Sequence, residues 1–68
     1  MPLVESSAID FVHYEPVTAE LTITFNSGKR YVYFAVPRGV SNALIAAPSI
    51  GAYFNAHIRD RYRYRRVE

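Results

Sequence analysis

Residues 20–26 alternate strictly between apolar and polar side chains, and this pattern constrains the fold more than any other feature of the chain. The apolar positions are Leu21, Ile23 and Phe25. Because successive side chains of a strand point to opposite faces, the pattern predicts a half-buried strand. Residues 26–29 predict a tight turn, since Gly28 can adopt a positive φ. Residues 30–36 are β-branched and aromatic, so they predict the partner strand.

A further strand is predicted upstream, over residues 8–14. Ile9 and Phe11 are two residues apart, with Asp10 between them, so we expect both side chains on the buried face. The other, partly covered face carries Ala8, Val12 and Tyr14. Pro16 lies in residues 15–19 and ends the strand. Because the connections between the three strands are short, we expect an antiparallel meander.

Two short helices are predicted after the strands. The first spans residues 38–47, between Pro37 and Pro48, where apolar residues recur at helical spacing. The second spans residues 50–59 and has Ser49 as its N-cap. Its apolar stripe consists of Ile50, Phe54 and Ile58. Strands followed by helices predict an α+β fold, in which a three-stranded antiparallel meander has both helices packed on one face.

The length and composition of the chain limit the classes of protein to which it can belong. Its 68 residues suffice for one small domain, which we assign to residues 7–67, with residues 1–6 as a flexible N-terminus. Without cysteine there is no disulfide framework and no thiolate metal site, and two histidines alone do not make a zinc site. No apolar run is long enough for a membrane span, so we expect a soluble cytoplasmic protein with no membrane partner.

Catalytic chemistry has no support in the sequence. The chain has no G-x-S-x-G nucleophile elbow and no cysteine nucleophile. Its glycines, at positions 28, 39 and 51, are isolated from one another, so they form no phosphate-binding loop. We therefore expect neither an enzyme nor a bound cofactor, and no small-molecule substrate is indicated.

The C-terminal segment is basic, whereas the rest of the chain is nearly neutral. Residues 59–68 hold five arginines and two carboxylates, and arginine alternates with tyrosine there. Guanidinium groups pair with phosphates and stack on bases, and tyrosine rings stack as well, so this segment is a candidate RNA-binding surface. Its residues are Arg61, Tyr62, Arg63, Tyr64, Arg65 and Arg66, joined by Lys29 and Arg30 from the predicted turn.

The same alternation also fits an extra edge strand docked on the sheet. In an extended segment, Tyr62 and Tyr64 lie on one face and the alternating arginines on the other. We favour this structural interpretation of the segment. It is compatible with RNA binding, because docked tyrosines would turn Arg61, Arg63 and Arg65 outward.

The order of several landmarks along the chain resembles that of a known family. In sequence order these landmarks are Tyr31-Val32-Tyr33, Val36-Pro37, Leu44, Ala46-Ala47-Pro48-Ser49, Gly51, Tyr53-Phe54-Asn55, Ile58, Arg61-Tyr62 and Tyr64-Arg65-Arg66-Val67. They resemble the KTSC domain, a short domain named for the C-terminus of some lysyl-tRNA synthetases that also occurs as a free-standing bacterial protein. The resemblance implies an uncharacterised domain with no assigned catalytic residues. RNA binding is suggested for this domain by the proteins in which it occurs.

Tyr31 and Tyr33 point to the same side of their predicted strand, and they allow two interpretations. On an open sheet, two rings at this spacing could stack on successive bases of RNA. Alternatively, the rings line the core and their hydroxyls reach its edge. In the family that the chain resembles, the residue between the two tyrosines is often polar, which favours the core. Here that residue is Val32, which implies a weaker electrostatic contact on that face.

Self-association, or binding of another protein, is the alternative function. A three-stranded sheet has two edges, and two short helices cover only one of its faces. The other face is expected to carry apolar side chains, namely Val12, Tyr14, Val32 and Phe34. Such a patch on a small domain often marks an interface, so a homodimer through this face or a sheet edge is the second hypothesis.

Overall fold

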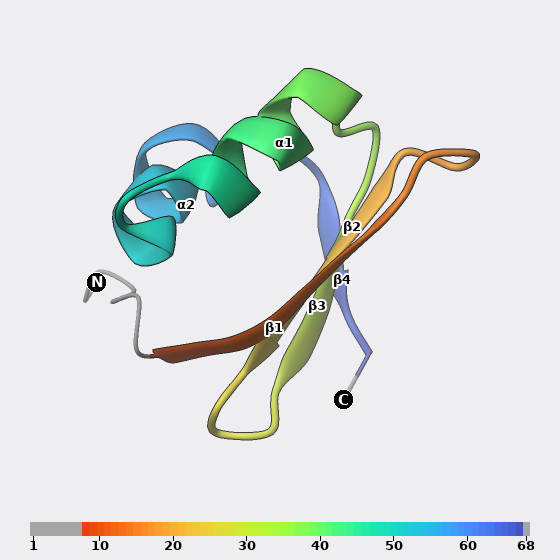
Figure 1. Ribbon diagram of the computed structural model, residues 1–68. Helices are drawn as coiled ribbons and strands as arrows, with labels where there is room; N and C mark the ends of the chain where they lie inside the picture. The colour runs from red at the N-terminus through yellow and green to blue at the C-terminus, as the bar shows by residue number, and fades with distance from the viewer. Residues whose placement is uncertain (1–7, 68) are drawn as a thin grey trace.

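The computed structural model describes residues 8–67, which form one four-stranded sheet and two helices (Figure 1). The strands are β1 (Ile9–Glu15), β2 (Glu20–Phe25), β3 (Arg30–Tyr33) and β4 (Tyr64–Arg66), and the helices are α1 (Arg38–Ala46) and α2 (Ile50–His57). The strand order is β1-β2-β3-β4, and every neighbouring pair is antiparallel. The α+β prediction is confirmed, whereas the flexible start predicted for residues 1–6 lies outside the described residues.

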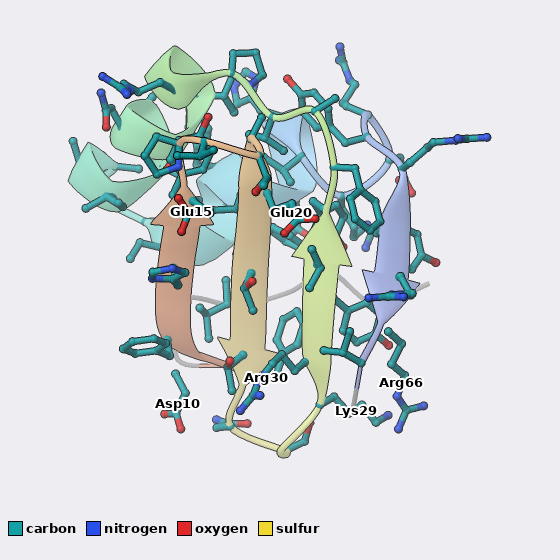
Figure 2. The ribbon with its side chains drawn as sticks, turned by 90° about the vertical axis from the view of Figure 1, so that its right-hand side faces the viewer. Asp10, Glu15, Glu20, Lys29, Arg30 and Arg66 are labelled. Atoms are coloured by element: carbon teal, nitrogen blue, oxygen red, sulfur yellow. The ribbon has the colours of Figure 1, made fainter. Side chains whose placement is uncertain are left out.

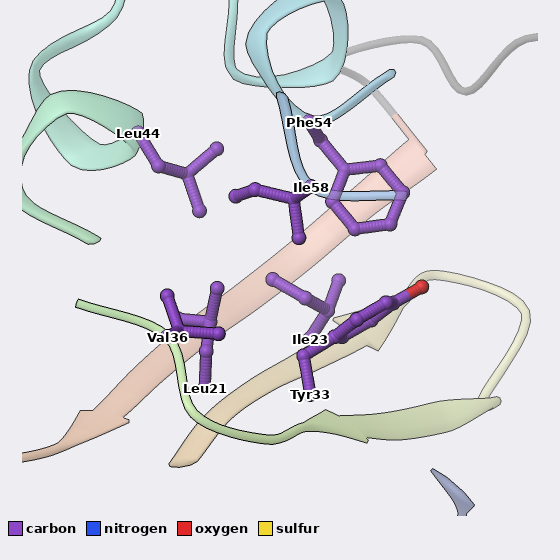
Figure 3. Packing of buried hydrophobic residues seen from close by; sticks show 7 residues of the cluster. All are labelled: Leu21, Ile23, Tyr33, Val36, Leu44, Phe54 and Ile58. Atoms are coloured by element: carbon purple, nitrogen blue, oxygen red, sulfur yellow. The ribbon is translucent and has the colours of Figure 1, made fainter. Parts of the chain in front are cut away.

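Both helices lie on one side of the sheet, which we call the covered face, and the other side is the open face (Figure 1). The core lies between the sheet and the helices (Figure 3). Its fully buried apolar side chains are Leu21, Ile23, Tyr33, Val36, Leu44, Phe54 and Ile58. The half-buried strand predicted from the alternation in residues 20–26 is therefore confirmed, with Phe25 partly buried at the border of the core.

A β-bulge interrupts the pairing between β1 and β2. Ile9 is opposite Phe25, but Phe11 is opposite Thr24, the very next residue back along β2. Asp10 is therefore an extra residue in β1. Side chains directly opposite one another share a face, so Ile9 faces the helices with Phe25, while Phe11 lies on the open face with Thr24. The prediction that Ile9 and Phe11 lie in step on the buried face is wrong.

The bulge also turns two other apolar side chains toward the covered face. A regular alternation would place both of them on the open face. Val12 and Tyr14 are opposite buried residues of β2, and both pack against the core. The Tyr14 hydroxyl donates a hydrogen bond of 2.7 Å to the carbonyl oxygen of Val36. The apolar patch predicted for the open face therefore lacks Val12 and Tyr14. It retains Val32, while Phe34 follows the end of β3 and is partly buried.

The helices begin where the sequence predicts. Ser49 Oγ accepts a hydrogen bond of 3.2 Å from the N–H of Ala52, which confirms Ser49 as the N-cap of α2. Phe54 and Ile58 of the predicted apolar stripe are fully buried, and Ile50 packs against the same core. Each helix ends one or two residues before its predicted limit, which is the usual scatter of helix ends.

β3 ends earlier than predicted because the chain turns at Ala35. The φ of Ala35 is 56°, which lies in the left-handed region. In an uninterrupted strand, Ala35 would share the covered face with Tyr33. The turn instead exposes Ala35 and buries Val36. The N–H of Val36 then donates to the carbonyl of Ala19 at 3.0 Å, which ties the turn to the β1–β2 connection.

Replacing Ala35 with glycine is expected to stabilise the domain by about 0.5–1 kcal/mol, because glycine adopts a positive φ without the steric cost borne by alanine. Urea denaturation followed by circular dichroism measures the change. Ala52→Gly in α2 is the control, and it should destabilise by up to about 1 kcal/mol because that backbone is helical. A loss of stability in Ala35→Gly would contradict the left-handed conformation.

Candidate nucleic-acid interface

The basic C-terminal segment forms an edge strand of the sheet. β4 lies antiparallel to β3, and the opposed pairs are Tyr33 with Tyr64, Val32 with Arg65 and Tyr31 with Arg66. Backbone bonds extend the pairing at both ends. The N–H of Phe34 donates to the carbonyl of Arg63, and the N–H of Val67 donates to that of Arg30, each at 2.9 Å. The docked-strand interpretation is therefore confirmed.

The pairing divides the side chains of β4 between the two faces. Arg65 is opposite Val32 and lies on the open face. Tyr64 is opposite the buried Tyr33 and lies on the covered face. The predicted separation of tyrosine from arginine is therefore confirmed for Tyr64 and Arg65. Arg66, two residues after Tyr64, shares the covered face with it, as the alternation requires.

Five aromatic rings form a closed circuit of contacts on the covered face. The centroid distances are 5.5 Å for Tyr33–Phe54, 6.1 Å for Phe54–Phe25, 5.7 Å for Phe25–Tyr31, 5.6 Å for Tyr31–Tyr64 and 5.3 Å for Tyr64–Tyr33. Tyr33 is only 3% exposed, and burial raises its pKa to about 12. The core interpretation is thus confirmed for Tyr33, and Tyr31 is partly buried against the same core. Neither ring lies on the open face.

The remaining tail residues predicted for RNA contact differ in accessibility. Tyr62 and Arg61 lie between α2 and β4. The Tyr62 side chain packs against the core, whereas Arg61 is exposed. Tyr64 is 55% exposed even though its ring contacts two other tyrosines. Of the two tail tyrosines, Tyr64 therefore has the larger surface available to a ligand.

Positive charge is concentrated where β4 runs beside β3. Lys29, Arg30 and Arg66 lie at the same end of the sheet (Figure 2), where a backbone bond joins Arg30 to the end of β4. Arg63 and Arg65 are exposed, and neither forms an ion pair with any residue in the range 8–67. We define the cationic edge as Lys29, Arg30, Arg63, Arg65 and Arg66.

Two carboxylates lie at the end of the sheet away from Lys29 and Arg30, whereas a third, that of the exposed Asp10 in the bulge, lies at the same end (Figure 2). Glu15 and Glu20 are directly opposite each other across β1 and β2. Figure 2 shows both at the end of the sheet away from Arg30. A polyanion that approaches the sheet is therefore attracted to the cationic edge and repelled by the two carboxylates.

Phe11 is a candidate contact residue that the sequence pattern does not indicate. It is 62% exposed on the open face, near the middle of β1. A period of two places Phe11 in the core with Ile9, and only the extra residue at Asp10 reverses its direction. The sequence carries no signal that distinguishes this bulge from a regular strand.

Within residues 8–67, no group of three or more His, Cys, Asp or Glu side chains is placed to hold a metal ion. None of the described helices has the length and apolar character needed to cross a membrane. His57 stacks on Tyr53 with a centroid distance of 4.4 Å on the surface of α2.

The model of the KTSC domain family matches residues 5–62 of the chain. The chain therefore belongs to the KTSC domain family, which confirms the resemblance seen in the landmarks. Its fold is similar to the crystal structure of a KTSC domain protein from Yersinia pestis, with a TM-score of 0.89 and 28% sequence identity. That match covers 98% of this chain and 94% of the Yersinia chain.

The sequence relatives are of two sizes. A lysine–tRNA ligase of Nostoc sp. is 43% identical over 93% of this chain, but the match covers only 11% of the ligase. A protein of Tsukamurella paurometabola is 40% identical, and the match covers 93% of this chain and 94% of that protein. The domain thus occurs as a small part of long proteins and as nearly the whole of short ones.

Proposed function

We propose that this KTSC domain is an RNA-binding module and that the cationic edge supplies its phosphate contacts. One observation carries the proposal: the pairing of β4 with β3 brings Arg63, Arg65 and Arg66 beside Arg30, next to Lys29 in the turn that precedes β3. Arginine pairs with phosphate through two parallel hydrogen bonds. Arg30, Arg65 and Arg66 are on paired strands, and the carbonyl of Arg63 is hydrogen-bonded to Phe34, so binding does not have to order their backbone.

Three further observations support RNA as the ligand. The carboxylates of Glu15 and Glu20 disfavour phosphate at their corner of the sheet, so the field of the protein orients a polyanion along the cationic edge. In addition, the chain is similar to a segment of lysine–tRNA ligases, which are named for a tRNA substrate. Tyr64 lies beside Arg66 at this edge, and its exposed surface is available for stacking on a base.

Removing two charges with Arg63→Ala and Arg65→Ala is expected to weaken RNA binding and its salt dependence together. If the edge neutralises about five phosphates of single-stranded RNA, the logarithm of the association constant falls with the logarithm of salt concentration at a slope near −3.5. The double variant should reduce the steepness of that slope by about 1.4. Fluorescence anisotropy of a labelled single-stranded RNA, titrated at several salt concentrations, measures both quantities.

Arg38→Ala is the matched control, because Arg38 is an exposed arginine at the start of α1 and outside the cationic edge. It should leave the slope unchanged. Amide chemical shifts recorded with RNA and with heparin separate specific binding from simple attraction to a polyanion. The proposal expects saturable shifts at residues 29–33 and 59–67 that heparin does not reproduce. It is wrong if RNA does not bind, or if the double variant binds with the wild-type slope.

A further inference from the structure

We propose that the open face binds unpaired bases of single-stranded RNA, with Phe11 as the ring on which a base stacks. This inference rests on the proposed function, and it specifies which kind of RNA binds and which face holds the bases. It starts from the bulge in β1, which places Phe11 on the open face with 62% of its surface exposed. The ring is held on a paired strand, so it is positioned before any ligand arrives.

Phe11 is aligned with the cationic edge across the sheet. It is directly opposite Thr24, which is directly opposite Arg30, so the three side chains form one row on the open face. Adjacent strands are about 4.8 Å apart, which places the backbones of β1 and β3 about 10 Å from each other. A nucleotide spans a similar distance from its phosphate to the far edge of its base. Its phosphate can therefore contact Arg30 while its base lies over Phe11.

A second row on the open face has similar residues, with its arginine one strand farther from the ring. It consists of His13, Thr22, Val32 and Arg65, each directly opposite the next. Both rows therefore have an aromatic ring on β1, a threonine on β2 and an arginine on the side of the cationic edge. The rings of Phe11 and His13 are two residues apart on one strand, a spacing that suits two successive stacked bases.

The two threonines suit the space between the rings and the arginines. Thr22 and Thr24 are short, so they leave the centre of the open face shallow enough for flat bases. Their hydroxyls can donate and accept hydrogen bonds, and neither side chain is fully exposed or fully buried. Bases with different polar edges can therefore be accommodated at the same positions.

The charge on the open face favours an RNA strand over a second copy of the protein. Arg30 and Arg65 lie on the β3–β4 side of the sheet, and the carboxylates of Asp10, Glu15 and Glu20 lie on its β1–β2 side, so a phosphate backbone is guided along the arginines. The core of a dimer interface is usually depleted of charge. Duplex RNA is less suitable, because its stacked and paired bases would leave Phe11 without a partner.

The test is the affinity of Phe11 variants for a fluorescein-labelled oligouridine. Phe11→Ala is expected to weaken binding by about 5- to 150-fold, the loss that truncation of a base-stacking ring causes. The slope of affinity against salt should stay that of the wild type, because no charge is removed. Phe11→Trp should retain the affinity, whereas Phe11→Leu, which is apolar but cannot stack in the same way, should behave like Phe11→Ala.

Ile45→Ala is the matched control, because Ile45 is a comparably exposed apolar residue on α1, in the helical layer. Thermal unfolding of each variant confirms that its fold is intact, and sedimentation gives its oligomeric state. Wild-type affinity in Phe11→Ala, together with weakened binding in the Arg63→Ala and Arg65→Ala variant, would overturn this inference and leave the proposed function standing.

Other results of the same experiment are equally decisive. Failure of the wild type to bind RNA overturns both the inference and the proposed function. A dimer that Phe11→Ala dissociates without a change in RNA affinity assigns the open face to a second copy and overturns the inference. An affinity for Phe11→Trp as low as that for Phe11→Ala shows that stacking on this ring does not contribute, and it overturns the inference as well.

Discussion

Phe54→Ala is expected to remove between about a third and all of the free energy of unfolding. The Phe54 side chain is 1% exposed, and its ring packs edge-on against Phe25 and Tyr33. Truncation of a buried phenylalanine costs about 3–5 kcal/mol through lost burial and the cavity left behind. The whole free energy of unfolding of a domain of this size is about 3–10 kcal/mol. Far-UV circular dichroism and urea denaturation measure the loss.

Phe25→Ala and Ile45→Ala are comparison variants, for which we expect smaller losses of stability than for Phe54→Ala. Phe25 belongs to the same ring circuit but is only partly buried, so we expect a smaller loss than for Phe54→Ala. Ile45 is 58% exposed on α1, so its truncation should change stability little. A folded Phe54→Ala variant with the wild-type unfolding midpoint would show that α2 does not pack on the sheet through this ring.

Raising the pH above 10 is expected to destabilise the domain through Tyr33. Burial, with a smaller contribution from the neighbouring Tyr64 and Tyr31, raises the pKa of Tyr33 from 10.0 to about 12. Between these two values the unfolded chain has lost a proton that the folded protein keeps, so stability falls as the pH rises. The stabilisation is complete below pH 10 and is lost toward pH 12. It amounts to at most about 2–3 kcal/mol, since one unit of pKa corresponds to about 1.4 kcal/mol and solvent near the hydroxyl screens part of the effect.

Tyr33→Phe is the control for this pH dependence, because it keeps the buried ring and removes the group that ionises. Urea midpoints measured on both sides of pH 10 should fall less steeply with pH in Tyr33→Phe than in the wild type. Tyrosinate absorbance should also show one hydroxyl that ionises only above the others or on unfolding. Equal losses of stability in the two proteins would rule out Tyr33 as the source.

The regular elements of the fold could be predicted because their patterns are local. Alternation identifies β2, the Gly28 turn identifies the hairpin, and Ser49 marks the start of α2. These signals depend on residues that are neighbours in sequence, and tertiary contacts do not override them here. The extended tail was also predictable, because tyrosine and arginine alternate in it as they do in β4.

The faces of the sheet were harder to predict because two residues change them without a sequence signal. Because Asp10 is an extra residue, Ile9 and Phe11 point to opposite faces of the sheet, whereas a regular alternation places them on the same face. Ala35 adopts a left-handed conformation that is usually occupied by glycine, and this conformation buries Val36. Both changes depend on packing of the whole domain. The basic residues of the candidate site were therefore predicted from the sequence, whereas its exposed ring, Phe11, was not.

The two free edges of the sheet also bear on how the protein behaves at high concentration. A sheet edge is a template on which another chain can add a strand, and proteins protect such edges with charge or with bulges. β4 carries guanidinium groups at its edge, and β1 carries a bulge at Asp10. Pairing of the β4 strands of two copies would bring like charges together. Pairing of their β1 strands would be disturbed by the bulge, where the backbone hydrogen bonds are irregular. We therefore expect the domain to resist growth into extended sheets and to remain soluble when concentrated.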